Sequence, residues 1–180
     1  LPKTVDPSAY KITFAPGLLT VPESLQGGLV VAGPRAGSKT EELTIPEGLG
    51  PDIKGLSTKV TFVESLPPFA PMALEGGGAF MKWREALETR DSVILHLEEG
   101  APAAVRKGQM IYIAGWPDAT GWRRLLDMLA EQAGLDLMDL PPDLRLRETD
   151  SHRFWFNYGP RAVTYQNITL PAAGVHWEVK

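Results

Sequence analysis

Short apolar runs separated by turn-forming residues fill the first two thirds of the chain and predict β-strands. They occupy residues 11–15, 29–32, 59–63, 92–97 and 109–114. The run at 29–32 is continuous rather than alternating, which is typical of a strand covered on both faces. The pattern predicts a sheet of the α/β class in which 92–97 and 109–114 form a pair. The stretch from Pro67 to Gly78 predicts an irregular surface crossing.

One amphipathic helix is predicted after residue 118. Its apolar residues recur at three- and four-residue intervals: Trp122, Leu125, Leu126, Leu129, Ala130 and Ala133. Asp118 or Thr120 can cap its start, and Gly134 suits the left-handed position after its end. We expect its apolar face to lie on the sheet beside the strand at 109–114. Between Leu19 and Leu29 a helix of only about six residues fits, and it would depend on packing.

The pattern changes at Pro141-Pro142 to apolar residues at every second position, which predicts further strands. These strands cover residues 144–146, 153–157, 162–165, 168–170 and 175–179. The chain is therefore expected to divide into an α/β domain at 1–140 and a small antiparallel β domain at 141–180. Because so short a domain buries little apolar surface, we expect it to dock on a larger neighbour.

Composition narrows the class of protein. Apolar residues make up 43% and charged residues 22% of the 180 residues, ordinary values for a soluble globular protein. No apolar run approaches the ~18 residues of a membrane span, and the segment from Leu1 to Asp6 has no signal-peptide core, so no membrane association is expected. The net charge of −4 with scattered Lys and Arg argues against a nucleic-acid partner. The absence of cysteine fits a reducing compartment, and we expect a cytoplasmic protein.

The segment from Gly33 to Thr40 superficially resembles a phosphate-binding loop. Such a loop needs four residues between its glycines and then Gly-Lys-Ser/Thr opening a helix. Here three residues separate Gly33 from Gly37, Ser38 precedes the lysine, and two glutamates and a proline follow. We therefore expect no nucleotide and no cofactor at this segment.

Four segments in one order resemble the β-galactosidases of glycoside hydrolase family 42, in the region that follows their catalytic barrel. They are Gly33-Pro34-Arg35-Ala36-Gly37-Ser38-Lys39-Thr40 with Ile45-Pro46, Val63-Glu64-Ser65-Leu66-Pro67-Pro68, Tyr112-Ile113-Ala114-Gly115-Trp116-Pro117, and Phe156-Asn157-Tyr158-Gly159-Pro160. The resemblance spans residues 10–177. It implies a flavodoxin-like or amidotransferase-like domain, with a mostly parallel sheet and flanking helices, that assembles trimers and is followed by a small antiparallel β domain.

The resemblance also implies a parent enzyme that hydrolyses terminal β-D-galactosides. The family's catalytic glutamates lie on an N-terminal barrel that this chain does not match, and the acid/base glutamate there directly follows an asparagine. Here Asn157 and Asn167 are followed by Tyr158 and Ile168. No catalytic residue is carried over, and the expected partners are further copies of the chain, preferably as a trimer, and the parent's catalytic barrel.

The residues themselves suggest no other chemistry. Retaining glycosidases need two carboxyl groups ~5 Å apart. The glutamates at positions 41, 42, 85, 88, 98 and 99 are interpreted as solvated surface instead. The three histidines lack metal-ligand spacing, so no metal is expected. Glutamine hydrolysis of the amidotransferase type needs a cysteine, and no Gly-x-Ser-x-Gly segment is present.

Three residues are candidates for contacts between domains or subunits. Arg35 can pair with a carboxylate across a boundary, and Lys39 lies on the same loop. Trp155 alternates with Phe154 and Phe156, so we expect it to be presented outward to a neighbouring domain or, alternatively, to a sugar. The leading hypothesis is a non-catalytic assembly module of a β-galactosidase. The alternative is a free-standing α/β module that binds carbohydrate or another small molecule at the carboxyl end of its sheet.

Overall fold

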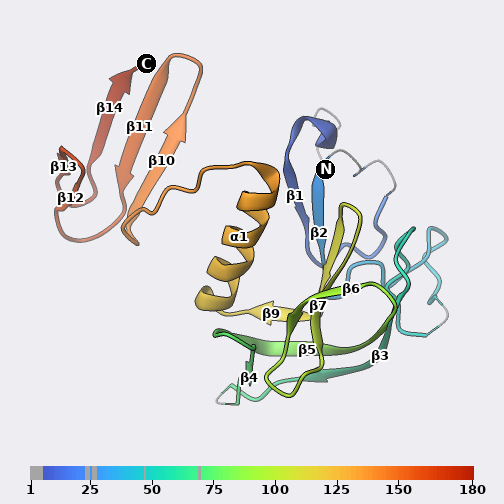
Figure 1. The fold of residues 1–180 in the computed structure, drawn as a ribbon. Coiled ribbons are helices and arrows are strands. Elements are labelled where there is room, and N and C mark those ends of the chain that lie inside the picture. Colours follow the sequence, from blue (N-terminus) through green and yellow to red (C-terminus); the bar gives the residue numbers. More distant parts are fainter. Residues whose placement is uncertain (1–5, 23–24, 26–27, 47, 69) are drawn as a thin grey trace. The chain divides into compact units, whose positions relative to one another are not determined.

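The computed structural model describes residues 6–22, 25, 28–46, 48–68 and 70–180. The chain divides into two compact units, Leu1–Leu135 and Asp136–Lys180 (Figure 1). The first unit contains two sheets, a short 3-10 helix (Pro7–Ala9) and one α-helix, and the second contains strands alone.

A five-stranded mixed sheet forms the centre of the first unit. Its strands in spatial order are β1 (Ile12–Ala15), β2 (Leu29–Ala32), β8 (Met110–Ile113), β7 (Pro102–Lys107) and β6 (Ser92–His96). The pairs β1–β2 and β2–β8 are parallel, whereas β8–β7 and β7–β6 are antiparallel. Half of this sheet therefore has the parallel order of an α/β protein, and the other half is a meander.

A second, antiparallel sheet is built around one long strand. It contains β3 (Thr58–Ser65), β5 (Ala79–Thr89), β4 (Met72–Ala73) and β9 (Gly115–Pro117), with β3, β4 and β9 all paired to β5. The pairing with β9 shifts register between Met81 and Arg84, where Lys82 adopts a φ of 66°. Phe80 and Glu85 are both buried and belong to opposite faces of β5, as strict alternation requires: Phe80 packs in the cluster that contains Leu125 of the helix that follows β9, and Glu85 hydrogen bonds to Tyr112 of the other cluster.

The helix α1 (Ala119–Ala133) is where the sequence predicts it. The Asp118 side chain caps its start by accepting from the Gly121 amide, and Gly134 ends it in the left-handed conformation with a φ of 58°. Leu125 and Leu129 are fully buried in a cluster with apolar residues of β2 and β8. The predicted caps and the predicted contact with the strand at 109–114 are confirmed.

Both faces of the five-stranded sheet are covered, but by different structures. Leu29 and Ile111 pack in the cluster that contains the apolar face of α1. Ala32 and Tyr112 point the other way and pack with Val60 of the second sheet. Continuous burial along β2 is thus explained by one helix and one sheet.

The predicted fold class is therefore wrong. In the described part of the chain, strands outnumber the single α-helix heavily, and no helix layer covers the second face of the sheet. A strand that is buried on both faces has the same apolar sequence whether helices or another sheet cover it. The flavodoxin-like sheet with flanking helices is replaced by a mostly β unit.

The predicted strands are present, although their pairing differs. The runs at 92–97 and 109–114 correspond to β6 and β8, which do not pair with each other because β7 lies between them. Sequence reasoning missed β7 and β5, and the crossing from Pro67 to Gly78 contains the short strand β4. The short helix expected between Leu19 and Leu29 falls largely on residues 23–24 and 26–27, outside the described residues. Nowhere in the described chain is a helix both long and apolar enough to cross a membrane.

The second unit is a three-stranded antiparallel sheet with a hairpin. The sheet has the order β10 (Leu144–Glu148), β11 (His152–Asn157) and β14 (Val175–Val179), and the hairpin consists of β12 (Val163–Tyr165) and β13 (Ile168–Leu170). Leu144, Trp155 and Leu170 form its buried core with partly buried residues of the hairpin. The hairpin covers the face of the sheet that carries Trp155.

Candidate functional site

The segment that follows β2, residues 33–38, is called the junction loop here because it links the two sheets of the first unit. Every residue of this loop except Arg35 is buried. Its amides are occupied within the chain: the Arg35 N–H donates to Glu85 Oε1 at 3.1 Å, and the Gly37 N–H donates to Leu18 O at 2.8 Å. A phosphate loop needs such amides to converge on a ligand. The junction loop therefore has the donors of a phosphate loop but directs them to its own protein.

Two glycines of the junction loop lie against backbone. Gly33 has a φ of 95°, and a Cβ added to it would lie 2.3 Å from Ile113 O. A Cβ on Gly37 would lie 2.8 Å from Asp52 O, at a φ of 66°. Both positions require glycine because the conformation and the space exclude a side chain. Gly33 thus allows close packing against β8, and Gly37 allows the close approach of the segment at Asp52.

Glu85 of β5 is the buried acceptor that holds the junction loop. Only 2% of it is exposed, and Tyr112 donates its hydroxyl to Glu85 Oε2 at 2.6 Å. Burial raises the pKa of Glu85, and the donors Tyr112 and Arg35 oppose this shift. Burial, together with the nearby Glu85 carboxylate, raises the pKa of Tyr112 far above its usual range. The phenol therefore stays protonated and serves as a permanent hydrogen-bond donor.

The burial of Glu85 corrects the sequence interpretation, which assigned it to solvated surface. Charge alone predicts exposure, whereas the buried Glu85 is compensated by hydrogen-bond donors from Tyr112 and the Arg35 amide, which lie far from it in the chain. The one sequence signal was indirect. Two of the segments that carry the family resemblance supply the partners of Glu85, namely Arg35 and Tyr112.

The candidate contact residue Arg35 lies at the surface end of this cluster. Its φ is 65°, and 41% of its side chain is exposed. The guanidinium lies 6.0 Å from the ring centroid of Trp83, and its Nη1 lies 3.9 Å from Glu85 Oε1. This long approach leaves most of the guanidinium donors for other acceptors.

Lys39 is half-buried and lies beside a different hollow. Its amide donates to Leu19 O at 2.9 Å, and its side chain helps line a hollow of about 270 Å³. Thr20, Val21, Glu41, Asp52 and Lys54 line the rest. The structure therefore places Arg35 in the junction loop and Lys39 directly after it, in different surroundings.

Trp155 is not presented outward, and that expectation is wrong. It is 2% exposed, and its ring centroid lies 5.7 Å from that of Tyr165 in the covering hairpin. The outward face carries Phe154 and Phe156 instead, with Trp177 opposite Phe154 in β14. Alternation was predicted correctly, but which of the two faces is buried depends on the hairpin.

Asn157 organises the end of β11. Its side-chain N–H groups donate to Arg161 O and Pro171 O, both at 2.7 Å, and its Oδ1 accepts from the Gly159 amide at 2.9 Å. A buried amide with all these partners fixes the turns around it. The segment from Phe156 to Pro160 therefore has a structural explanation within the second unit.

An exposed loop follows the junction loop directly. We call residues 40–46 and 48–49 the outer loop. Thr40 and Thr44 close a tight turn in it: the Thr40 N–H donates to Thr44 O at 3.0 Å, and their hydroxyls lie 2.8 Å apart. Leu43 lies within this turn at a φ of 61° and is 66% exposed, and Ile45 is 71% exposed. Sequence reasoning missed these residues, although apolar side chains among glutamates and proline were a visible signal.

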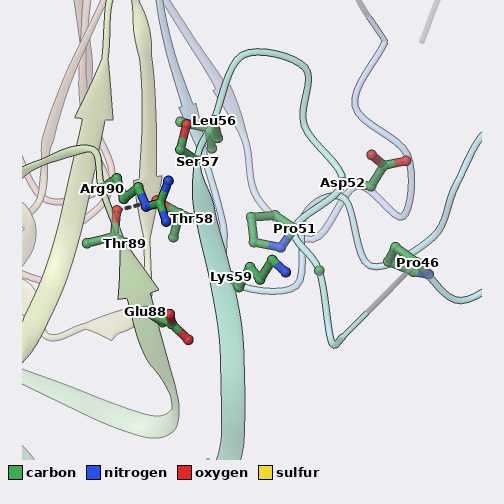
Figure 2. A pocket seen from close by; sticks show the side chains of 11 residues that line it. Pro46, Pro51, Asp52, Leu56, Ser57, Thr58, Lys59, Glu88, Thr89 and Arg90 are labelled. Carbon is green, nitrogen blue, oxygen red and sulfur yellow. Dashed lines mark hydrogen bonds between the residues drawn. The ribbon is translucent and has the colours of Figure 1, made fainter.

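A hollow of about 560 Å³ lies between the segment from Pro46 to Leu56 and the adjoining ends of β3 and β5. Figure 2 shows Pro46 and Pro51 on the loop side, Thr58 and Thr89 on the strands, and Arg90 directly after β5. The hydroxyls of Thr58 and Thr89 lie 2.6 Å apart and hydrogen bond to each other. Lys59 and Glu88 also line this hollow, so it carries both signs of charge. In the part of the chain that the structure describes, no three His, Asp or Glu side chains gather as a metal site.

Comparisons with known proteins agree with the resemblance in sequence. The family model described as "Beta-galactosidase trimerisation domain" matches residues 1–136. A β-galactosidase of Thermus thermophilus is 45% identical over 141 residues, which are 76% of this chain and 22% of that protein. The β-galactosidase BgaA of a Thermus species is 42% identical over 165 residues, 86% of this chain and 26% of that protein. The chain thus spans about a quarter of the length of these curated relatives.

Solved structures show the same fold. The β-galactosidase of the psychrophilic Marinomonas ef1 aligns with a TM-score of 0.86 at 30% identity, covering 97% of this chain and 30% of that one. The β-galactosidase of the Antarctic haloarchaeon Halorubrum lacusprofundi aligns with a TM-score of 0.82 at 24% identity, covering 100% of this chain and 33% of that one. At this identity the alignment is evidence for a shared fold only. Since the family model covers most of the chain, the chain belongs to the trimerisation-domain family of the family 42 β-galactosidases.

Proposed function

We propose that this chain is a non-catalytic assembly module, the trimerisation and C-terminal region of an enzyme that hydrolyses terminal β-D-galactosides. The observation that carries the proposal is the match of residues 1–136 to the trimerisation-domain family. In this proposal residues 1–140 associate with copies of themselves, and residues 141–180 form a C-terminal β domain. Hydrolysis belongs to the catalytic barrel of the parent enzyme.

The cluster around Glu85 supports a structural role for the junction loop. The carboxylate accepts from Tyr112 through one oxygen and from the Arg35 amide through the other. A carboxyl group engaged in this way fixes the two sheets of the first unit against each other. We propose that the exposed part of Arg35, and Lys39 beside it, form polar contacts with a neighbouring subunit or with the barrel.

Native mass spectrometry of the 19.6 kDa chain tests the assembly role. We expect a species of three chains whose population grows with concentration, and no turnover of a chromogenic β-galactoside. A chain that stays monomeric at every concentration would contradict assembly, and robust turnover would contradict the non-catalytic assignment. Unchanged assembly and unchanged melting of Arg35→Ala would remove Arg35 from the contact.

A second candidate function, binding of a sugar or another small molecule, has support from the hollow in Figure 2. Its volume of about 560 Å³ and its hydroxyl-bearing wall suit a small polar ligand. Calorimetric titration with galactose and with lactose distinguishes the two functions. Heat of binding that disappears in Thr89→Val would favour the second candidate, and absent heat together with a trimer would favour assembly.

A further inference from the structure

The outer loop holds a leucine in a conformation that leucine avoids. Leu43 has a φ of 61°, a left-handed value that is sterically unfavourable for a residue with a side chain. Glycine or asparagine would adopt it more easily. A strained residue persists when its surroundings impose the conformation, and such residues cluster at functional positions. The strain at Leu43 therefore marks the outer loop as a candidate functional position.

Local hydrogen bonds impose this conformation. The Leu43 amide donates to Thr40 O at 2.9 Å, and the Thr44 amide donates to Thr40 Oγ1 at 3.2 Å. With the Thr40–Thr44 contacts described above, they fix the turn before any partner arrives. Two apolar side chains are consequently held in water, with Leu43 66% and Ile45 71% exposed. Because the turn is already rigid, these two side chains lose less conformational entropy on binding than side chains on a flexible loop would.

We propose that Leu43 and Ile45 are the apolar anchor by which one copy of the chain docks on the next copy in the trimer. This inference rests on the proposed assembly function and names its surface. A second copy is the occupant because the anchor lies inside the stretch that matches the trimerisation-domain family. A closed three-membered ring joins two different patches of each copy, so the anchor requires a separate acceptor.

The acceptor that we assign is an apolar hollow at the end of β1. It has a volume of about 130 Å³ and is lined by Thr13, Phe14, Ala15, Pro16, Leu18 and Leu25. Phe14 lines this hollow and is 43% exposed, and Leu19, which follows the lining residue Leu18 in the chain, is 54% exposed. The chain segments that adjoin the two patches are joined to each other, since the Lys39 amide donates to Leu19 O at 2.9 Å.

Sedimentation velocity across a range of concentrations tests the anchor. We expect the double variant Leu43→Ser/Ile45→Ser to associate about 30-fold or more weakly per contact than the wild type, as for a buried anchor residue. The matched control is Val175→Ser/Val179→Ser, which changes two valines of the second unit that are 56% and 68% exposed. The control should sediment like the wild type, and circular dichroism should show both double variants folded.

The absence of cysteine allows a direct test of the acceptor. Ile45→Cys labelled with a benzophenone maleimide should photo-cross-link to residues 13–19 of a second copy, whereas Val179→Cys should not. Association of Leu43→Ser/Ile45→Ser as tight as that of the wild type would overturn the anchor, and cross-links confined to other surfaces would overturn the acceptor. In both cases a wild-type trimer would leave the proposed function standing. A wild type that never associates would contradict the proposed function and the anchor together.

Discussion

The junction loop and the outer loop are consecutive in the chain, and each contains one residue with a side chain at positive φ. Arg35 adopts 65° and Leu43 adopts 61°. At Arg35 a buried carboxylate from another strand imposes the conformation, through a bond that spans 50 positions in the sequence. At Leu43 hydrogen bonds within five consecutive residues impose it. Similar backbone strain is therefore maintained by the tertiary fold in one loop and by local contacts in the other.

The contrast implies that mutations in the two loops should affect different properties of the protein. Changes in the junction loop should alter the free energy of unfolding, because its partners belong to the core. Changes in the outer loop should alter association and leave folding nearly intact, because its side chains contact little of their own chain. Three comparisons between the loops test this division.

Alanine at one glycine of each loop should give the largest difference. Gly33→Ala places its Cβ 2.3 Å from Ile113 O, whereas at Gly48 no atom lies within 4 Å of the added Cβ. Both glycines have positive φ, 95° and 78°, so only the steric term differs. We expect losses of about 3 kcal/mol or more for Gly33→Ala and about 1 kcal/mol for Gly48→Ala. Urea unfolding followed by circular dichroism measures both, and equal losses would contradict the division.

The pH dependence of stability should reveal Glu85, the buried carboxyl group of β5 that accepts from the junction loop. Burial raises the pKa of Glu85 in the folded state, so the folded protein binds its proton more tightly than the unfolded chain does. This contribution to stability is fully present below the unfolded pKa and is lost as the pH rises through the higher folded pKa. Glu85→Gln cannot titrate and should lack it.

We therefore expect the stability of the wild type, relative to Glu85→Gln, to rise as the pH falls from neutral toward the usual pKa of a glutamate. Urea titrations of both proteins at matched pH values measure the difference. The pKa of Glu148 shifts in the opposite direction, because Lys180 and Arg153 lower it. Since both proteins contain Glu148, its contribution cancels in the difference between them. Glu42→Gln in the outer loop is the control and should follow the wild type. A constant difference between wild type and Glu85→Gln at all pH values would refute the effect.

The same contrast explains how much of the molecule the sequence could predict. Local signals were sufficient for α1, because its caps and its apolar spacing lie within the segment itself. They also placed the strands of the second unit and those at 12–15 and 29–32. Each of these elements is specified by residues close to it in the chain.

The errors concern features that distant residues decide. Whether helices or a sheet cover the second face of β2 depends on β3 and β5, and the buried state of Glu85 depends on donors from Arg35 and Tyr112. Trp155 is buried because the hairpin of β12 and β13 packs on its face of the sheet. Apolar alternation gives the two faces of a strand but not which of them is covered.

Asparagine at Leu43 should have the smallest effect on folding and is the most specific test of the outer loop. Asn tolerates the left-handed conformation better than Leu, so Leu43→Asn should change the free energy of unfolding by less than about 1 kcal/mol, in the stabilising direction. The turn remains closed, because its hydrogen bonds involve the backbone and the two threonines, none of which changes. Urea unfolding of dilute protein measures the folding term, and sedimentation at high concentration measures association. If the outer loop serves to present Leu43, the Leu43→Asn variant should be equally or more stable and should associate more weakly. If the turn serves only the fold of its own chain, association should not change.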